Sequence, residues 1–513
     1  MVQHSREEIL SILKIIPQTS VATQNGSRIR SRMMHFTNDN DFNFYLSSLK
    51  GDPKTVQILQ NSNVSLLVLK YEGDFPAATE VEVTGFAEIV HDENARENWF
   101  KEVASKSPIV KYMVDTKNTD KLDLIRVSPE IVKFRLASEI VQGIPPTVFE
   151  FPQNKNSEND TVLLKRKLKN WSIEARIPFV TASIIPVILG TAIAATTTTE
   201  INILFFALAL IGVASLHLSA NILNDYFDHK SGTDGINKEF VRPFSGGSRA
   251  IQLGLLTPFE VMSGGVFFLI VGALVGIFFT FTSGWPVFAV MLVALASVFF
   301  YTSPPLSLAS RGIGEIVVGL NLGYLATFGA YFVQTGNLSM ESILTTFVAA
   351  TPVALLIAAV LYINEFPDYN ADKAIGKNHL VIRLGKSKAA VGYALMIIVT
   401  YASIILSVAT RVMPVQTLLG LLTLPLAVRA VKYALAFHSQ TMNLVPANAA
   451  TINIHLYTGA MLVAGYLISI APANTQLIFA AITAIVTGSL IMRVDRQLGA
   501  AHKITAGVKQ TVS

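Results

Sequence analysis

The chain has 513 residues, of which 51% are hydrophobic and 15% are charged, and this balance excludes a single ordinary soluble domain. Cysteine is absent, which excludes disulfides, thiolate metal sites and cysteine nucleophiles. The formal net charge of +5 is small and gives no evidence for a nucleic-acid partner.

Residues 1–150 are predicted to form a small soluble β-barrel. A short helix is expected at 7–15 and another at 92–104. Runs rich in β-branched and aromatic residues predict strands at 19–23, 42–46, 64–69, 80–90 and 131–136. The first residues lack the apolar core of a signal peptide, so we expect this domain to stay in the cytoplasm.

Residues 151–170 are polar at their start and are interpreted as a linker. Residues 171–513 then consist of long apolar runs, each about 18 residues or longer, which is enough to cross a hydrocarbon core roughly 30 Å thick. The predicted domain is an all-α membrane bundle of about nine to ten transmembrane helices, placed near 177–196, 202–223, 258–281, 284–302, 313–333, 342–364, 388–409, 413–431, 450–471 and 474–492.

The loops between these spans differ strongly in basic residues. With a cytoplasmic N-terminus, nearly all loop Lys and Arg residues fall on the cytoplasmic side, and the outer loops hold only Arg411. The positive-inside rule requires this asymmetry. We therefore predict a multi-pass protein of the cell (inner) membrane whose N-terminal domain is cytoplasmic.

Two acidic clusters lie at predicted helix ends on the cytoplasmic side. Side chains three and four residues apart share one face of a helix. The members of the first cluster are Asn221, Asn224, Asp225 and Asp228, with Asp234 nearby; those of the second are Asn364, Asp368 and Asp372.

So many acids around one cavity repel each other unless cations neutralise them. Mg²⁺ does this when carboxylates hold it together with substrate phosphate oxygens. We predict that the metal ligands are Asp225, Asp228, Asp234, Asp368 and Asp372. Each cluster, taken alone, is also compatible with solvated acids that pair with nearby lysines.

Basic residues follow each cluster and are candidates for binding a diphosphate: Arg242 and Arg249 after the first, Lys377 and Arg383 after the second. Each is also compatible with an ordinary membrane anchor. A third loop runs from Tyr301 through tandem prolines to Arg311 and Glu315. Arg311 and Glu315 lie one turn apart, so a simple ion pair between them stays open.

From about Arg176 to the end, the chain resembles the UbiA superfamily of intramembrane aromatic prenyltransferases. The resemblance rests on Asn224-Asp225-Tyr-Phe-Asp228, on the run Pro243 to Arg249, on Tyr301 to Glu315, on Asp368-x-x-x-Asp372 with Gly376-Lys377 and Arg383-Leu-Gly, and on the late Val445-Pro-Ala and His455. It is most similar to the MenA branch. Relatives often carry threonine after the glycine–lysine pair, whereas this chain has Asn378-His379.

The resemblance implies Mg²⁺-dependent transfer of a polyprenyl group from its diphosphate to 1,4-dihydroxy-2-naphthoate, with decarboxylation, in menaquinone biosynthesis. It assigns catalytic roles to Asp225, Asp228, Asp368, Asp372, Tyr301 and Arg311, and diphosphate binding to Asn221, Asn224, Arg242, Arg249, Asn364, Lys377 and Arg383. Other acceptors, such as 4-hydroxybenzoate or a lipid glycerol phosphate, fit the same chemistry. A cation-coupled transporter is a further alternative, but its acids would lie near the membrane midplane.

The front domain is similar to the split barrels of pyridoxamine 5′-phosphate oxidase relatives. The pattern includes Arg32-Met-Met, Phe44 to Ser48, Lys54 and Asn61 to Val64. This resemblance implies an FMN site in which Arg32 and Lys54 hold the phosphate, with Ser47 and Ser48 as partners. A barrel that has lost its cofactor, or that binds another ligand, stays open.

Overall fold

The computed structural model describes residues 4–510, except 26–27, 71–77, 152–158, 233–240, 242–243 and 253–254. The chain divides into two compact units, one of residues 1–172 with 253–257 and the other of residues 173–252 with 258–513. Part of the predicted linker forms helix α6 (Asn159–Glu174). The predicted domain limits at 150 and 171 stay predictions.

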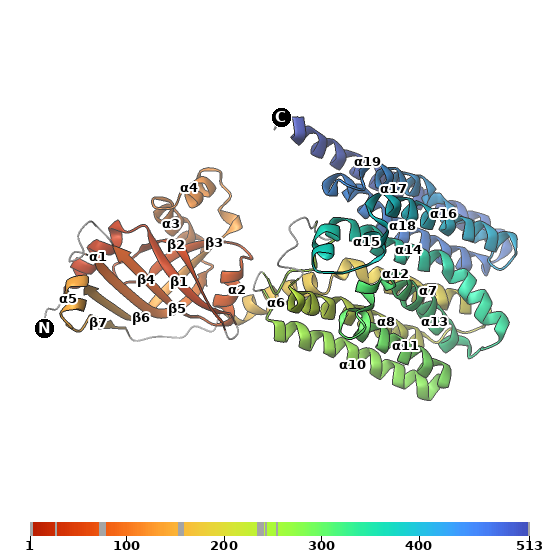
Figure 1. Ribbon diagram of the computed structural model, residues 1–513, viewed down its shortest axis with the longest axis horizontal. Coiled ribbons are helices and arrows are strands. Elements are labelled where there is room, and N and C mark those ends of the chain that lie inside the picture. Colours follow the sequence, from red (N-terminus) through yellow and green to blue (C-terminus); the bar gives the residue numbers. More distant parts are fainter. Residues whose placement is uncertain are drawn as a thin grey trace. The chain divides into compact units, whose positions relative to one another are not determined.

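The first unit is a closed antiparallel barrel (Figure 1). The order of its strands is β3-β2-β1-β4-β5-β6-β7, and an additional pairing of β3 with β6 closes the sheet. The strands are β1 (Gln18–Asn25), β2 (Arg28–Asn38), β3 (Phe44–Leu49), β4 (Asn63–Lys70), β5 (Thr79–Val90), β6 (Leu122–Leu136) and β7 (Thr147–Glu150). Closure leaves β7 as a short extension on β6.

Alternation of side chains explains the barrel core. Every second residue of β5 is buried, as expected for a strand with one face inside. Helix α1 (Arg6–Ile15) adds its apolar face to the same core through Ile9, Leu10 and Leu13. The other helices of this unit are α2 (Pro53–Gln60), α3 (Glu93–Ala104), α4 (Pro108–Asp115) and α5 (Ala137–Val141).

The second unit is a bundle of long apolar helices. Nine helices in the described residues are long and apolar enough to cross a membrane. They are α8 (Ile203–Ser231), α10 (Pro258–Ser283), α11 (Trp285–Thr302), the helix Gly314–Thr335, α14 (Met340–Ala374), α16 (Lys386–Ala409), the helix Val415–Phe437 that contains α17 (Leu424–Phe437), α18 (Thr441–Ser469) and Ala473–Val494 within α19 (Ala473–Gln510). The first predicted span is a shorter helix, α7 (Thr181–Ala194).

Helix Gly314–Thr335 is not regular. Its first turn, α12 (Gly314–Val318), leads into a π-helical segment, Gly319–Leu325, before α13 (Ala326–Thr335) resumes α-helical geometry. Two short helices, Leu308–Arg311 and α15 (Leu380–Leu384), lie in the loops before α12 and α16. Such π segments concentrate at functional sites.

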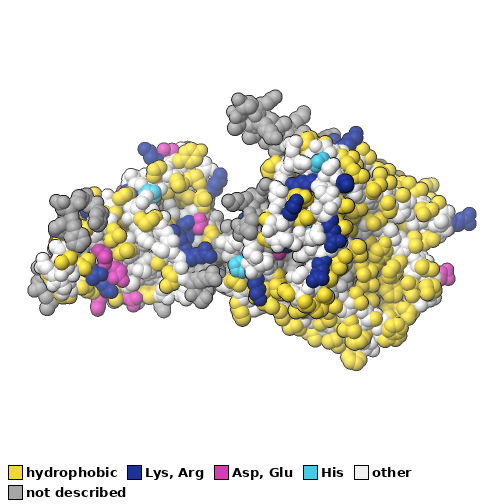
Figure 2. Space-filling view, viewed as in Figure 1, with side chains coloured by type: hydrophobic (Ala, Val, Ile, Leu, Met, Phe, Trp, Pro, Cys, Tyr) yellow, Lys and Arg dark blue, Asp and Glu magenta, His cyan; other side chains and the backbone are white. Residues whose placement is uncertain are grey.

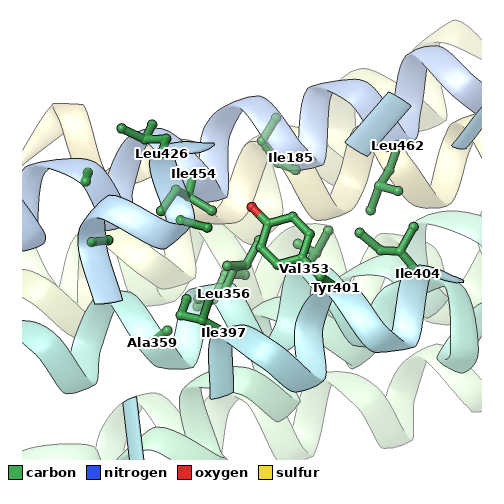
Figure 3. Packing of buried hydrophobic residues seen from close by; sticks show 14 of the residues in the cluster. Ile185, Val353, Leu356, Ala359, Ile397, Tyr401, Ile404, Leu426, Ile454 and Leu462 are labelled. Carbon is green, nitrogen blue, oxygen red and sulfur yellow. The ribbon is translucent and has the colours of Figure 1, made fainter. Parts of the chain in front are cut away.

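The packing of the bundle is centred on α14 and α18. Apolar side chains of α7, α14, α16, α17 and α18 interdigitate in one buried cluster, as the close-up shows for Ile185, Val353, Tyr401, Leu426 and Ile454 (Figure 3). By contrast, α10 and α11 bury under a fifth of their most apolar stretches. On the face in Figure 2, hydrophobic side chains cover the flank of this unit. A flank of this kind suits contact with lipid.

Helix α14 has 35 residues, so its length is roughly 50 Å at 1.5 Å per residue. This exceeds the hydrocarbon thickness of about 30 Å. The acidic cluster at its C-terminal end can therefore stand at the edge of the bilayer, where a carboxylate costs far less than at the midplane.

Candidate active site

A cavity of about 380 Å³ opens between α8, α10, α11, Gly314–Thr335 and α14. Its walls are apolar over most of their length, with residues such as Val275, Phe279 and Leu325. Polar side chains gather at one end and are Asn221, Asn224, Asp228, Tyr301, Asn364, Glu365, Asp368, Asp372, Lys377 and His379. The structure thus brings members of the two predicted clusters to one place.

Asp225 and Asp228 lie near the C-terminal end of α8 but in different surroundings. Asp225 is 3% exposed, pairs with Arg176 and accepts a hydrogen bond from the backbone N–H of Ser248 at 2.8 Å. Asp228 lines the cavity and accepts from the Asn224 amide at 3.2 Å. One carboxylate anchors the loop after α8, and the other faces the space for substrate.

That loop approaches the site very closely. Gly247 has φ +69°, and a Cβ built there would lie 2.9 Å from Oδ1 of Asp225. The neighbouring Gly246, with φ +75°, donates its N–H to Asp368 at 3.2 Å. Glycine is needed here because only it allows both the left-handed backbone and the close approach. The loop therefore joins the two clusters through its backbone.

The second cluster lies on the last turns of α14. Asn364 accepts a hydrogen bond from the buried Asn448 amide at 2.8 Å, which fixes its orientation toward the cavity. Asp368 and Asp372 follow one and two turns later and also line the cavity. The spacing read from the sequence thus does place these side chains along one face.

Lys377 links the two helices. Its Nζ lies 3.1 Å from Oδ1 of Asp228 and 3.2 Å from Oδ1 of Asp372. Burial lowers the pKa of Lys377, but the two carboxylates outweigh burial and raise the pKa above its usual value. Lysine is therefore a cation here, placed where acids from α8 and α14 converge.

His379 occupies a similar position on the other side of Asp372. Its ring nitrogens lie 2.9 Å from a carboxylate oxygen of Glu365 and 3.4 Å from one of Asp372. Burial lowers the pKa of His379, but the two acids reverse this and raise it to about 9 from 6.5. The two acids thus favour the protonated form of the imidazole.

Some predicted residues lie away from the cavity. Arg311 donates to the carbonyl of Pro305 at 2.9 Å, and it forms no ion pair with Glu315 among the described residues. Arg383 donates to the carbonyls of Asn378 and Arg311 and so ties two loops together. Arg249 does not line the cavity either. Asp234 and Arg242 lie outside the described residues.

Sequence reasoning missed several polar cavity residues, among them Arg176, His379 and Asn321. Arg176 counted only among the basic residues of the cytoplasmic side, yet it lines the cavity and pairs with Asp225. His379 stood out only as a departure from the family pattern. Asn321, in the π-helical segment, also lines the cavity; its amide donates to Ser297 at 3.0 Å, while its carbonyl oxygen is buried without a partner in the described structure. The sequence signal that could have identified Asn321 is its position as a single amide residue within an apolar span.

In the barrel, the residues nominated for FMN are already engaged. Arg32 donates to Thr23 and Gln57 at 2.8 Å, and Nζ of Lys54 lies 2.6 Å from Asp52. Ser47 and Ser48 lie on β3, where β3 pairs with β6. The bond from Arg32 to Gln57 joins β2 to helix α2, and the FMN site stays a prediction.

Comparison with known proteins decides the family of the helical unit. Residues 183–443 match the model of the UbiA prenyltransferase family, which is half of the chain. The chain belongs to this family. It is therefore a prenyltransferase, and the transporter alternative finds no support.

Relatives from distant organisms align with almost their whole length. The chain is 28% identical over 365 residues to UbiA prenyltransferase domain-containing protein 1 of Xenopus tropicalis, covering 71% of this chain and 96% of that protein. It is 28% identical to 1,4-dihydroxy-2-naphthoate octaprenyltransferase of Bacillus subtilis, with 62% and 98% covered. It is 26% identical to 2-carboxy-1,4-naphthoquinone phytyltransferase of Synechocystis, with 58% and 93% covered.

Solved structures match parts of the chain. A digeranylgeranylglyceryl phosphate synthase matches 59% of this chain and 99% of its own, at 19% identity and a TM-score of 0.36. A pyridoxamine 5′-phosphate oxidase-like protein of Listeria innocua matches 26% of this chain and 98% of its own, at 23% identity and a TM-score of 0.21. A prenyltransferase bundle joined to an N-terminal barrel, as the sequence predicted, is confirmed.

Proposed function

We propose that this prenyltransferase moves a polyprenyl group from its diphosphate to the ring of 1,4-dihydroxy-2-naphthoate. The observation that carries the proposal is the convergence of acids from α8 and α14 on Lys377, at the polar end of an otherwise apolar cavity. Such a cavity suits a substrate with a charged head and a long apolar tail. The names of the bacterial relatives support the naphthoate acceptor.

The carboxylates fit the Mg²⁺ that the family resemblance implies, because hard oxygen ligands are those it prefers. The ammonium of Lys377 shows that acids of both helices already gather around one positive charge. Among the described residues, no three His, Asp or Glu side chains are arranged as a ready metal site, so we propose that Mg²⁺ binds together with the diphosphate. Its ligands would be Asp228, Asp368 and Asp372, which line the cavity, together with Asp234, which lies outside the described residues, and Asp225, which would exchange its pairing with Arg176 for the metal. When bound, Mg²⁺ supplies charge neutralisation for the departing diphosphate.

The chain's own cations assist the same step. Lys377 and Arg176 stand at the polar end of the cavity and stabilise negative charge that develops as the carbon–oxygen bond to the diphosphate breaks. The apolar walls exclude water from the allylic carbon, which would otherwise be hydrolysed. Tyr301 lines the same cavity.

The acceptor lies next to the allylic carbon. The electron-rich ring carbon that bears the carboxylate attacks, the new carbon–carbon bond forms, and diphosphate leaves with the electron pair of the broken bond. Carbon dioxide then departs from the ring carboxylate, and its bonding pair restores the aromatic ring. We propose that the unpartnered carbonyl oxygen of Asn321 accepts a hydrogen bond from a ring hydroxyl.

Product analysis tests this proposal. The purified protein, Mg²⁺, dihydroxynaphthoate and a set of prenyl diphosphates should give a prenylated, decarboxylated product by mass spectrometry, whereas 4-hydroxybenzoate should not react. Asp225→Ala and Asp368→Ala should each lower the rate by at least about 10²-fold. Glu200→Ala, an exposed acid outside the cavity, should leave the rate unchanged. Mg²⁺-dependent transfer retained in both aspartate variants would refute the assignment.

We further propose that the barrel and the active site face the cytoplasm, as the asymmetry of Lys and Arg indicates. Because the chain has no cysteine, single cysteines can report the orientation. Lys388→Cys, next to the active-site end, should react with an impermeant maleimide only after cells are opened. Thr410→Cys, at the other end of α16, should react in intact cells. The reverse pattern would contradict the orientation.

A flavin in the barrel is the remaining proposal. The proposal is supported by the proximity of the two nominated cations. Lys54 pairs with Asp52, and the charge of Asp52 also acts on Arg32, so both cations lie near the same acid. FMN added to the full chain should give a bound-flavin spectrum that the Arg32→Gln variant lacks. Failure of the unmodified protein to retain FMN would remove the proposal and leave prenyl transfer unaffected.

A further inference from the structure

A second cavity lies at the end of the bundle opposite the active site. Its volume is about 650 Å³, and it is formed by the ends of α7, α16 and α18 and the start of α14. Glu341 lines this cavity, whereas Asp372 lines the active site, and the two residues stand 31 positions apart on α14. That separation corresponds to roughly 45 Å of helix, close to the full thickness of a bilayer with its headgroups. The second cavity is therefore at the level of the far headgroups.

The cavity contains two opposite charges that do not neutralise each other. Arg411 is the only basic residue of the loops at this end, and its side chain is exposed. Neither Arg411 nor Glu341 forms an ion pair among the described residues, although both line the cavity. A site that holds a cation and an anion apart suits a ligand that carries both charges.

The remaining lining is rich in hydroxyl groups and includes one buried group without a partner. Tyr466 is 3% exposed, and its hydroxyl has no hydrogen-bond partner in the described structure. A buried polar group of this kind is uncommon and indicates a missing partner. Ser342, Thr345 and Ser469 line the same space and offer further hydroxyls, while Val412 and Val415 supply an apolar side.

The backbone holds Arg411 in an uncommon conformation. Its φ is +61°, a region that favours glycine, and the N–H groups of Val412 and Met413 both donate to the carbonyl of Ser407. A residue other than glycine is strained in this conformation. The turn thus sets the position of the Arg411 backbone beside the cavity that this residue lines.

We propose that this cavity binds the headgroup of a zwitterionic phospholipid, such as phosphatidylethanolamine. Arg411 and the hydroxyls would bind the phosphate, and Glu341 would bind the ammonium group. Guanidinium groups bind phosphate through charge-assisted hydrogen bonds, and carboxylates bind ammonium in the same way. The apolar side of the cavity would contact the start of the acyl chains.

Native mass spectrometry of the full chain, released from nanodiscs with equal amounts of phosphatidylethanolamine and phosphatidylglycerol, tests the proposal. The unmodified protein should retain phosphatidylethanolamine preferentially. Arg411→Gln and Glu341→Gln should each reduce this retention by about tenfold, the effect of losing roughly 1.4 kcal/mol. Tyr466→Phe should weaken it less. Lys388→Gln, which removes an exposed charge at the active-site end, should retain the lipid like the unmodified protein.

Three outcomes would overturn the proposal. Equal retention of both lipids would show that the ammonium group is not recognised. Retention unchanged in both charge variants would place the lipid elsewhere on the bundle. Displacement of the lipid by inorganic phosphate alone would identify free phosphate as the ligand. Prenyl transfer measured on the same samples is a separate readout, since Glu341 and Arg411 do not line the active-site cavity.

Discussion

Lys377 offers the sharpest test of the active-site geometry. Methionine has a similar length but no charge, so Lys377→Met removes the ammonium that lies between Asp228 and Asp372. The two carboxylates then repel each other with no cation between them. The substitution should therefore harm both the diphosphate-binding step and the stability of the metal-free protein.

General magnitudes for such interactions give the expected losses of rate and of stability in Lys377→Met. Loss of one preorganised group that stabilises developing charge lowers the rate about 10²–10³-fold, or roughly 2.7–4 kcal/mol. Removing one partner of a buried ion pair destabilises a protein by about 3–5 kcal/mol. We expect about 3 kcal/mol, the lower end of that range, because the side chain of Lys377 is still 19% exposed and water can partly solvate the acids.

Two measurements separate these effects. Steady-state kinetics with varied prenyl diphosphate should show the loss mainly in kcat/KM. Thermal unfolding should show a lower Tm without Mg²⁺ and a larger increase in Tm on adding Mg²⁺ than in the unmodified protein, because metal would replace the missing charge. Lys373→Met is the matched control, since Lys373 is exposed and its Nζ lies over the Tyr369 ring at 5.7 Å rather than beside the acids. Normal activity together with an unchanged Mg²⁺ effect on Tm in Lys377→Met would refute this account of the site.

Three further predictions concern the active-site loop, the barrel and the acceptor. Gly247→Ala should abolish transfer in an activity assay, because the added Cβ meets a carboxylate at 2.9 Å. Gly232→Ala is the control, since Gly232 has φ +84° with nothing within 4 Å, and unfolding curves should show a cost of only about 1–2 kcal/mol of stability. In the barrel, His4 lies 2.9 Å from Glu139. Burial lowers the pKa of His4, but Glu139 and Glu8 outweigh burial and raise this pKa above 6.5. Burial raises the pKa of Glu139, but its hydrogen bonds outweigh burial and bring this pKa below 4.5. The contribution of His4 to stability is complete below pH 6.5 and is lost as pH rises through its raised pKa, whereas that of Glu139 is complete above pH 4.5 and is lost as pH falls through its lowered pKa. In unfolding experiments on the full chain from pH 4 to 9, the stability should therefore be highest between about pH 4.5 and 6.5. The His4→Gln variant should lose less stability as pH rises above 6.5 than the unmodified protein does. Asn321→Leu should raise KM for the dihydroxy acceptor but not for the prenyl diphosphate, and an equal rise in both would contradict the assigned contact.

Local patterns explain which parts of the fold were predictable. Alternation of side chains predicted β5 almost to the residue, and hydropathy located every long helix of the bundle. It missed the polar ends of three helices, because α8 and α14 continue beyond their predicted ends at 223 and 364, and α18 begins before its predicted start at 450. The second strand, β2 (Arg28–Asn38), was not recognised because its polar, arginine-rich sequence lacks a clear apolar face. The π-helical segment Gly319–Leu325 was also invisible, since it follows from packing rather than from composition.

The active site was likewise predictable only in part. Spacing of three and four residues was enough to place Asp225 with Asp228, and Asp368 with Asp372, on single helix faces. It could not show that Asp225 is covered by Arg176 while Asp228 faces the cavity. The two residues have the same chemistry and nearly the same local sequence context, and only the neighbouring loop distinguishes them.

A barrel joined to a membrane bundle with two acidic helix ends could be predicted from residues alone, because hydropathy and side-chain periodicity are local properties of the chain. Which cations meet those acids depends on the folded arrangement. Lys377 reaches Asp228 across 149 residues of sequence, and Arg383 instead binds loop carbonyls although it is only six residues away from Lys377. Such choices depend on how the helices pack, and a side chain's partner is set by that packing rather than by its place in a motif.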